Sequence, residues 1–227
     1  MPRARSTKMH RETAVIPQEI GSGCFSGFTI IPLAVVLTSF ILASMVLQTN
    51  PNQMGTMPDS IPSNLSPIFR QEVLHWSDSI ARWASASNLD PNLVATIMQI
   101  ESCGDPRATS SAGAMGLFQV MPFHFHANEN PYDPETNALR GLSYLARSLA
   151  AANGDARLAM AGYNGGIGVI PRAESTWSAQ TKRYVQYGLP IYIDAVSGVN
   201  PSNALNEWYS RYGASLCHQA AQRLGLP

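Results

Sequence analysis

The stretch VATIMQIESCGDPRATSSAGAMGLFQVMP, residues 94–122, holds an apolar helical repeat that ends in a carboxylate. Val94, Ile97 and Met98 follow helical spacing and predict a buried face. Glu101 stands three residues after Met98, on the same face. A carboxylate on a buried face loses hydration, which disfavours its charged form and raises its pKa. Such a group suits general acid catalysis near neutral pH. A glutamate that simply reaches solvent at a helix end is the plain alternative.

Helical signals continue on both sides of this stretch. Asp90-Pro91 and Asp133-Pro134 each combine an N-cap with a first-turn proline, and Asn153-Gly154 is typical of a helix end. No alternating run of strand length is found, and residues 103–131 are predicted to form irregular loops. The fold class is therefore mainly α, with helices predicted over residues 65–88, 91–102, 134–152, 155–164 and 205–224.

The N-terminal part of the chain predicts a membrane anchor. Residues 27–47 carry no charge, and as a helix they match a hydrocarbon core of roughly 30 Å. Four basic residues precede this segment: Arg3, Arg5, Lys8 and Arg11. The positive-inside rule then predicts that residues 1–26 are cytoplasmic and that the remainder lies on the far side. A cleaved signal peptide is the alternative, although no clear Ala-x-Ala site follows. Residues 48–66, rich in Pro, Asn and Ser, are predicted to be a linker.

Composition excludes some classes of function. Basic and acidic residues balance at 15 each, so a nucleic-acid partner is not expected. His124 and His126 alternate, but no third ligand follows at a useful spacing, and neither a metal nor an organic cofactor is predicted. Cys103 and Cys217 would both face an oxidising space beyond the membrane. The sequence is consistent with a disulfide between these cysteines and also with two free buried thiols.

Four motifs follow one another along the chain: Glu101-Ser102, PRATS at 106–110, GAMGLFQVMP at 113–122 and AGYNGG at 161–166. DPETN at 133–137 and TKRYV at 181–185 accompany them. In this order they resemble the signature of the soluble lytic transglycosylase family, whose fold is similar to goose-type lysozyme. The resemblance covers residues 66–193. It implies a lysozyme-like helical domain that acts on the glycan strands of peptidoglycan.

The resemblance also implies a mechanism with a single carboxylate. Most glycosidases use two, but in this family the N-acetyl oxygen of the substrate supports the developing cation. Glu101 would donate a proton to the β-1,4 oxygen between N-acetylmuramic acid and N-acetylglucosamine. It would then accept the proton of the muramyl 6-hydroxyl, which attacks C1 and leaves a 1,6-anhydromuramyl end.

Further roles follow from the same resemblance. Tyr163 matches a tyrosine that hydrogen-bonds and orients the glutamate, while Gln119 and Met121 match residues that line the sugar site. The remaining substrate-binding matches are Ser102, Ser110, Asn164 and Tyr184. Ser102 and Ser110 are also open to a plain capping role, and Asn164 to holding the loop backbone before Gly165-Gly166.

Some positions depart from the family pattern. Cys103-Gly104 and Phe118 stand where a bulky residue and methionine are frequent, and Gln180 stands where an acid is frequent. Gly162 and Gly165 replace frequent alanines, which predicts a looser helix end. Trp177, Trp208 and the aromatic stripe near the C-terminus are interpreted as core.

These interpretations combine into one predicted organisation. Residues 67–195 form the catalytic domain and residues 196–227 a C-terminal helical extension. The protein is predicted to be a single-pass protein of a bacterial inner or cytoplasmic membrane, with its domain on the periplasmic, cell-wall side. Two alternatives stay open. One is a hydrolytic muramidase of the same fold, with Asp105 as its candidate second carboxylate. The other is a weakly catalytic glycan-binding scaffold of an envelope-spanning assembly.

Overall fold

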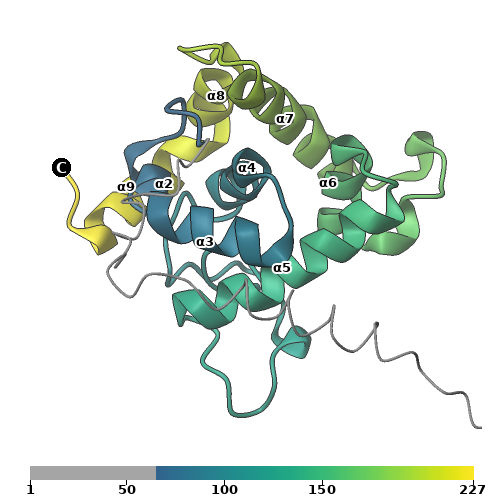
Figure 1. The fold of residues 1–227 in the computed structure, drawn as a ribbon, viewed down its shortest axis with the longest axis horizontal. Helices are drawn as coiled ribbons and strands as arrows, with labels where there is room; N and C mark the ends of the chain where they lie inside the picture. The colour runs from purple at the N-terminus through teal and green to yellow at the C-terminus, as the bar shows by residue number, and fades with distance from the viewer. Residues whose placement is uncertain (1–64) are drawn as a thin grey trace, which may run out of the picture. The chain divides into compact units, whose positions relative to one another are not determined.

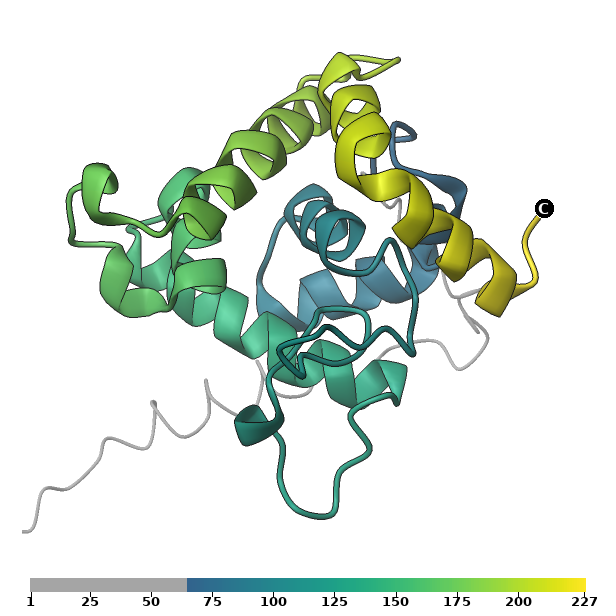
Figure 2. The same cartoon turned by 180° about the vertical axis from the view of Figure 1, so that it is seen from behind.

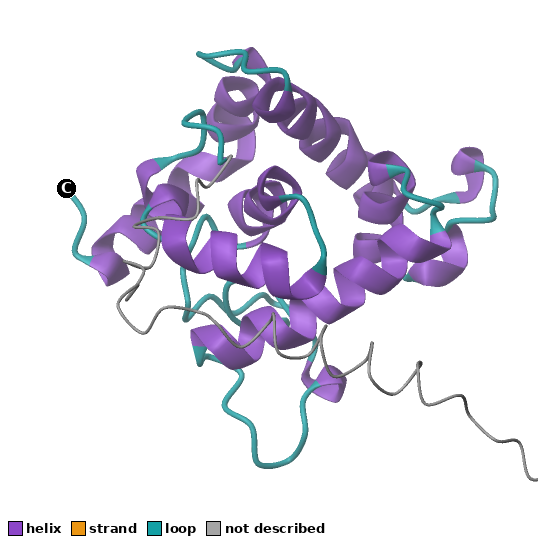
Figure 3. Cartoon of the chain, in the orientation of Figure 1, coloured by secondary structure: helices purple, strands orange, loops and turns teal. Residues whose placement is uncertain are grey.

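The structure is a computed structural model that describes residues 65–227. Helices dominate this part of the chain, and its β pairing is confined to isolated bridges around Met115 (Figure 3). The mainly helical fold class is thereby confirmed. The α-helices are α2 (Gln71–Leu74), α3 (Ser77–Ser87), α4 (Pro91–Glu101), α5 (Pro134–Ala151), α6 (Ala156–Gly165), α7 (Ala179–Val196), α8 (Asn203–Trp208) and α9 (Ala214–Leu224). Short 3-10 turns occupy Pro122–His124, Ile167–Val169 and Glu174–Thr176, and a π-helical turn spans Tyr209–Gly213.

Helix α4 lies at the centre of a ring of helices. Figure 1 shows it end-on, and Figure 2 shows the same arrangement from behind. The ring runs through the contacts α3–α5, α5–α6, α6–α7, α7–α8, α8–π-turn, π-turn–α9 and α9–α2, and the chain itself joins α2 to α3. Residues 92–99 of α4 are all buried, including the polar Asn92, Thr96 and Gln99. A helix that is covered on every side leaves only its ends for a functional group, and Glu101 is its last residue.

The local signals of the sequence place the helix ends. Asp90, Asp133 and Asp155 accept hydrogen bonds from the amides of Asn92, Thr136 and Leu158, at 2.7, 2.8 and 3.1 Å. Each aspartate satisfies an amide that has no partner within its helix, so the N-caps predicted at Asp90 and Asp133 are confirmed and Asp155 is a third. Asn153 and Gly154 have positive φ and end α5, as predicted.

Three helices differ from the sequence-based expectation. The predicted helix over residues 65–88 is divided at Trp76, whose indole donates to the Gly104 carbonyl at 2.9 Å. The predicted C-terminal helix is interrupted by the π-turn. Helix α7 was not predicted at all. In its buried stripe, Val185 and Ile191 alternate with Thr181, Gly188 and Ala195, which are small or weakly apolar, so the periodic signal is weak.

Helix α9 is linked to the loop that follows Glu101 by a disulfide and by polar contacts. Cys103 and Cys217 are joined by a disulfide with a Cα–Cα distance of 5.0 Å, which selects the bonded alternative over free thiols. The buried Asp105 carboxylate accepts from Arg223 at 2.8 Å and from Gln219 at 3.0 Å. These cross-links explain why a cysteine occupies position 103 directly after the Glu-Ser pair.

The loop between residues 103 and 131 is organised by one buried amide. Asn137, from the DPETN motif in α5, donates to the carbonyls of Met115 and Pro131, both at 2.8 Å. Its Oδ1 atom accepts from the amide of Phe118 at 2.9 Å. Because this one side chain satisfies three backbone groups of the loop, it fixes the segment that carries Gln119 and Met121.

The glycines of α6 serve close packing. A Cβ at position 162 would lie 2.3 Å from Ser148 Oγ and 2.7 Å from Ile170 Cδ1, so a larger residue there would require these side chains to shift. Helix α6 continues through Gly165 without a break. These glycines allow the neighbours of α6 to approach, and the prediction of a looser helix end stays a prediction.

The predicted N-terminal segment 1–26, the anchor 27–47 and nearly all of the linker 48–66 lie outside the described residues. Among the helices of the described region, none combines the length and the apolar character that crossing a membrane requires.

Candidate active site

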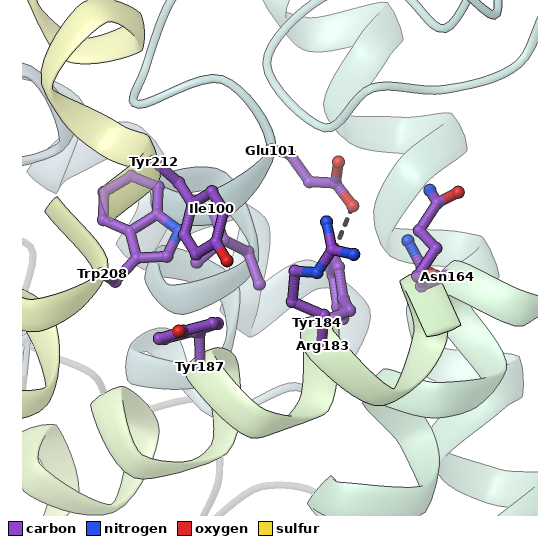
Figure 4. A pocket seen from close by; sticks show the side chains of 9 residues that line it. Ile100, Glu101, Asn164, Arg183, Tyr184, Tyr187, Trp208 and Tyr212 are labelled. Atoms are coloured by element: carbon purple, nitrogen blue, oxygen red, sulfur yellow. Dashed lines mark hydrogen bonds between the residues drawn. The ribbon is translucent and has the colours of Figure 1, made fainter. Parts of the chain in front are cut away.

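Glu101 ends the central helix with its carboxylate held by a tyrosine of α7. Tyr184 Oη donates to Glu101 Oε1 at 2.8 Å (Figure 4). Burial and the nearby Glu101 charge raise the pKa of Tyr184 well above 10, so its hydroxyl keeps the proton that it donates. The carboxylate therefore has one fixed oxygen.

The surroundings of Glu101 favour its neutral form. Burial raises the pKa of Glu101 from 4.5 to about 8, and the hydrogen bond from Tyr184 opposes this shift only in part. The C-terminal end of α4 adds to the same tendency, because the helix dipole is negative there and disfavours a carboxylate. Glu101 is thus protonated near neutral pH, as a general acid must be.

Two pockets meet at Glu101. The first, which we call the loop pocket, has a volume of about 320 Å³. Its walls include Ser110, Gln119, Met121, His124, Tyr144 and Tyr163. The second, the aromatic pocket, has a volume of about 220 Å³. Its walls include Ile100, Arg183, Tyr184, Tyr187, Trp208 and Tyr212 (Figure 4).

Both pockets share Glu101, Asn164 and Gln180, so they form adjoining parts of one cleft. Among the described residues that line them, Glu101 is the only carboxylic acid. A chain-like substrate that occupies both pockets would therefore cross the acid at their junction. This arrangement suits proton transfer to a linkage between two units.

Several residues predicted to bind substrate lie in the loop pocket. Gln119, Met121 and Ser110 line it together, on the loop that Asn137 fixes. The side-chain Nε2 atom of Gln119 donates to the carbonyls of Gly116 and Ala108, at 3.0 and 3.3 Å. Gln119 is itself held with a φ of +46°. These contacts fix the side chain in a single position on the pocket wall.

The structure exchanges the roles predicted for two tyrosines, Tyr163 and Tyr184. Tyr163 was expected to hydrogen-bond Glu101, but its hydroxyl donates to the Phe118 carbonyl at 2.7 Å. Tyr184, expected only to line the cleft, holds the carboxylate instead. Tyr163 still lines the loop pocket beside Glu101. The reason is geometric, because α7 passes the end of α4 and brings Tyr184 within reach.

Ser102 departs from its expected position, whereas Asn164 does not. Ser102 is fully buried and lines neither pocket. Its hydroxyl donates to the Leu117 carbonyl at 2.7 Å and accepts from the Gly104 amide at 3.1 Å, so it joins backbone segments behind the site. Asn164 lines both pockets, on the cleft where the resemblance placed it, and its side chain accepts from the Thr181 hydroxyl at 3.2 Å.

Asp105 is not placed as a second carboxylate. It is fully buried, is bound by Arg223 and Gln219, and lines neither pocket. It also accepts from the Arg107 amide at 2.9 Å. With its acceptor sites engaged in this way, it stabilises the loop and has no access to a water in the cleft.

Sequence reasoning missed most of the aromatic pocket. Gln180, Arg183, Tyr184 and Tyr187 follow the spacing i, i+3, i+4 and i+7, a helical stripe that a search for polar and aromatic periodicity would have found. Trp208 is buried, as expected of a core residue, yet it also lines the pocket. Tyr212, interpreted as core, is 48% exposed and belongs to the pocket wall.

Comparison with known families agrees with the motif resemblance. Residues 78–186 match the family model described as Transglycosylase SLT domain. This range contains Glu101, the loop pocket and the first turns of α7. It ends before α8, so Trp208 and Tyr212 lie outside it.

Curated relatives carry related names. The chain is 40% identical over 113 residues to a transglycosylase of Enterobacteria phage PRD1, which covers 49% of this chain and 40% of that protein. It is 28% identical over 127 residues to membrane-bound lytic murein transglycosylase E of Buchnera aphidicola, and this match covers 49% of this chain and 58% of that protein. It is 27% identical over 168 residues to the soluble lytic murein transglycosylase of Escherichia coli, and this match covers 61% of this chain and 26% of that protein. The chain thus spans less than two thirds of each relative.

Solved structures show partial likeness. An inactive mutant of lytic transglycosylase Slt from Pseudomonas aeruginosa aligns with a TM-score of 0.46 and 24% identity, over 60% of this chain and 26% of that one. The 70 kDa soluble lytic transglycosylase of Escherichia coli aligns with a TM-score of 0.39 and 21% identity, over 66% of this chain and 25% of that one.

Proposed function

We propose that this chain, which carries a Transglycosylase SLT domain at residues 78–186, is a peptidoglycan lytic transglycosylase. Glu101 is its catalytic acid and base, and the products carry 1,6-anhydromuramyl ends. The observation that carries this proposal is the position of Glu101. It is the only carboxylic acid among the described residues at the junction of two pockets, and its environment keeps it protonated.

The first step is proton donation. Protonated Glu101 gives its proton to the glycosidic oxygen while the bond from that oxygen to C1 breaks. The N-acetyl oxygen of the muramic acid stabilises the positive charge that develops at C1, so no second carboxylate is required. Tyr184 keeps one carboxyl oxygen in place, which leaves the other oxygen to face the substrate.

The second step returns the proton. The carboxylate of Glu101, now charged and unfavourably solvated, takes the proton of the 6-hydroxyl as that oxygen attacks C1. The acid form is regenerated, the anhydro ring closes, and no water is consumed. A pKa of about 8 suits both steps, because the group is protonated at rest and basic enough to accept a proton.

Mass spectrometry of muropeptides released from purified peptidoglycan tests this proposal. Products lighter by one water and without a reducing end are expected from the wild type, and none from Glu101→Gln. Glu174→Gln is the matched control, since Glu174 is an exposed glutamate that lines neither pocket. Wild-type products with ordinary reducing ends would overturn the anhydro mechanism in favour of hydrolysis.

A hydrolytic muramidase has little support from the site. Such an enzyme generally needs a second carboxylate to activate water, and Asp105, the candidate for that role, is engaged behind the cleft. A glycan-binding scaffold of an envelope-spanning assembly would not require Glu101 to be protonated. Glycan binding by the wild type without any product would support that alternative.

We further propose that the domain works on the cell-wall side of a bacterial inner or cytoplasmic membrane, anchored by residues 27–47. The uncharged segment with its preceding basic residues supports this location. One relative also has a name that includes the word membrane-bound. The full-length chain is expected to remain with membranes through an alkaline carbonate wash. Its recovery in the soluble fraction, shortened at the N-terminus, would indicate a cleaved signal peptide.

A further inference from the structure

The aromatic pocket is built from two parts of the chain. One wall is the stripe of α7 that contains Arg183, Tyr184 and Tyr187. The other wall is Trp208 with Tyr212, which follow the end of the residues matched to the family (Figure 4). Tyr187 and Tyr212 join the walls by an edge-to-face contact with ring centroids 5.1 Å apart. The C-terminal segment is therefore part of the cleft beside the catalytic acid.

The π-turn gives this second wall its form. Tyr209–Gly213 inserts a wider turn between α8 and α9, a feature that is frequent at functional sites. A Cβ at position 213 would lie 2.4 Å from the Trp208 ring, so glycine lets the indole lie against the backbone. Trp208 is buried by this contact, while Tyr212 stays 48% exposed on the pocket wall.

The charge of the aromatic pocket is positive. Arg183 is exposed, and no ion pair joins it to an acid of the described chain. Its guanidinium lies 6.0 Å from the centre of the Tyr212 ring. The one carboxylic acid that lines the pocket, Glu101, is neutral near pH 7. A guanidinium with aromatic neighbours and no internal partner suits a planar carboxylate with an apolar body.

We infer that the aromatic pocket binds a carboxylate-bearing stem peptide of the glycan strand, with Arg183 as its anion-binding side chain. This inference rests on the proposed function, because the stem peptide is attached to the muramic acid whose linkage Glu101 cleaves. The loop pocket offers amides and hydroxyls suited to an N-acetyl sugar. The aromatic pocket offers a positive charge and rings suited to a peptide. The C-terminal segment thereby becomes a determinant of substrate specificity.

The test compares two substrates with the full-length protein. One is peptidoglycan with intact stem peptides, and the other is the same glycan stripped of its stems by an amidase. The ratio of kcat/KM for the first substrate to that for the second measures recognition of the stem. We expect a ratio well above one for the wild type, a loss of about tenfold in Arg183→Gln, and partial recovery in Arg183→Lys. Tyr212→Ala should lower the ratio in the same direction.

Arg172→Gln is the matched control, because Arg172 is also an exposed arginine but lines neither pocket. Circular dichroism would establish that each variant folds. A wild-type ratio near one, or an equal ratio in wild type and Arg183→Gln, overturns the inference while leaving the proposed function in place.

A binding measurement separates this inference from the proposed function. In the Glu101→Gln background, calorimetry with soluble stem-bearing fragments should show binding that weakens about tenfold when Arg183 is also replaced. If the wild type cleaves neither substrate while this binding persists, the proposed activity fails and the assignment of the pocket stands. If the fragments bind equally with and without Arg183, the assignment of the pocket fails.

Discussion

Tyr184 and Glu101 lie 83 positions apart in the chain, and their side chains meet in a hydrogen bond of 2.8 Å. The contact joins the last residue of the central helix to the second turn of α7. It favours the ionised carboxylate, whereas burial favours the neutral form, and burial dominates. The acidity of the candidate catalytic group is therefore set by two opposing effects that separate experiments can address.

The activity is expected to fall as the pH rises through about 8. Glu101 must be protonated to donate to the leaving oxygen, and its pKa is raised to about 8, so the acid form is lost above that value. The measurement is kcat/KM on peptidoglycan from pH 5 to pH 10. A basic limb near pH 5 would mean that the carboxyl titrates close to its ordinary value.

Tyr184→Phe should move that basic limb to higher pH. The lost hydrogen bond stabilised the charged carboxylate, so its removal raises the pKa of Glu101 further. The rate should fall as well, by about tenfold or more, because the carboxyl loses its fixed orientation. The same pH series reports both effects.

Tyr192→Phe is the matched control for Tyr184. Tyr192 is another tyrosine of α7, but its hydroxyl faces Asp90 and it lines neither pocket. Its replacement should leave the basic limb where it is in the wild type. An equal displacement in both variants would show that the effect is not transmitted through the contact with Glu101.

Glu101→Gln should stabilise the fold above neutral pH. The pKa is raised on folding from 4.5 to about 8, so the folded state binds a proton that the unfolded state has released in this window. Wild-type stability therefore falls as the pH rises between these values, and the variant escapes that loss. Because Glu101 is only half-buried, we expect a gain of ~1–2 kcal/mol at pH 8 and little at pH 4.5. Urea unfolding at both pH values measures it, and a variant less stable at both would contradict the assignment.

The two serines of the signature region should differ in their effects. Ser102→Ala leaves the Gly104 amide and the Leu117 carbonyl without their buried partner, which should lower the free energy of unfolding by about 1–3 kcal/mol. Ser110→Ala removes a hydroxyl on the loop pocket that accepts from the Ala114 amide. We expect Ser110→Ala to change KM more than it changes the free energy of unfolding. Unfolding and kinetics on both variants decide the point, and a reversed pattern would place Ser102 in contact with substrate.

Removal of the disulfide should destabilise the protein without displacing Glu101. Cys103 and Cys217 are 114 positions apart, so the cross-link restricts a long loop of the unfolded chain. We expect the Cys103→Ser, Cys217→Ser double variant to lose about 2–4 kcal/mol. Thiol labelling of the denatured wild type before and after reduction checks that the bond exists. Equal labelling under the two conditions would show that the cysteines are free.

Most of the helices could be predicted from the sequence, because their signals are local. A cap such as Asp90 binds an amide two residues away, and an apolar stripe repeats within a few turns. The same locality placed Glu101 at the buried end of α4, and motif order placed Gln119, Met121 and Tyr163 around it. Helix α7 escaped prediction because its buried stripe mixes two strongly apolar residues with small or weakly apolar ones.

The chemistry of the site was decided by tertiary structure. Whether Tyr163 or Tyr184 reaches Glu101 depends on how α7 crosses the end of α4, and no local pattern contains that distance. The disulfide, the burial of Asp105 and the joining of Arg183 to Tyr212 likewise connect segments far apart in the chain. The sequence by itself therefore determined which residue is the candidate acid and most of the helices around it, but not α7. The packing of those helices determined the partner of the acid, its pKa and the second pocket beside it, because desolvation and charge act through space and not along the chain.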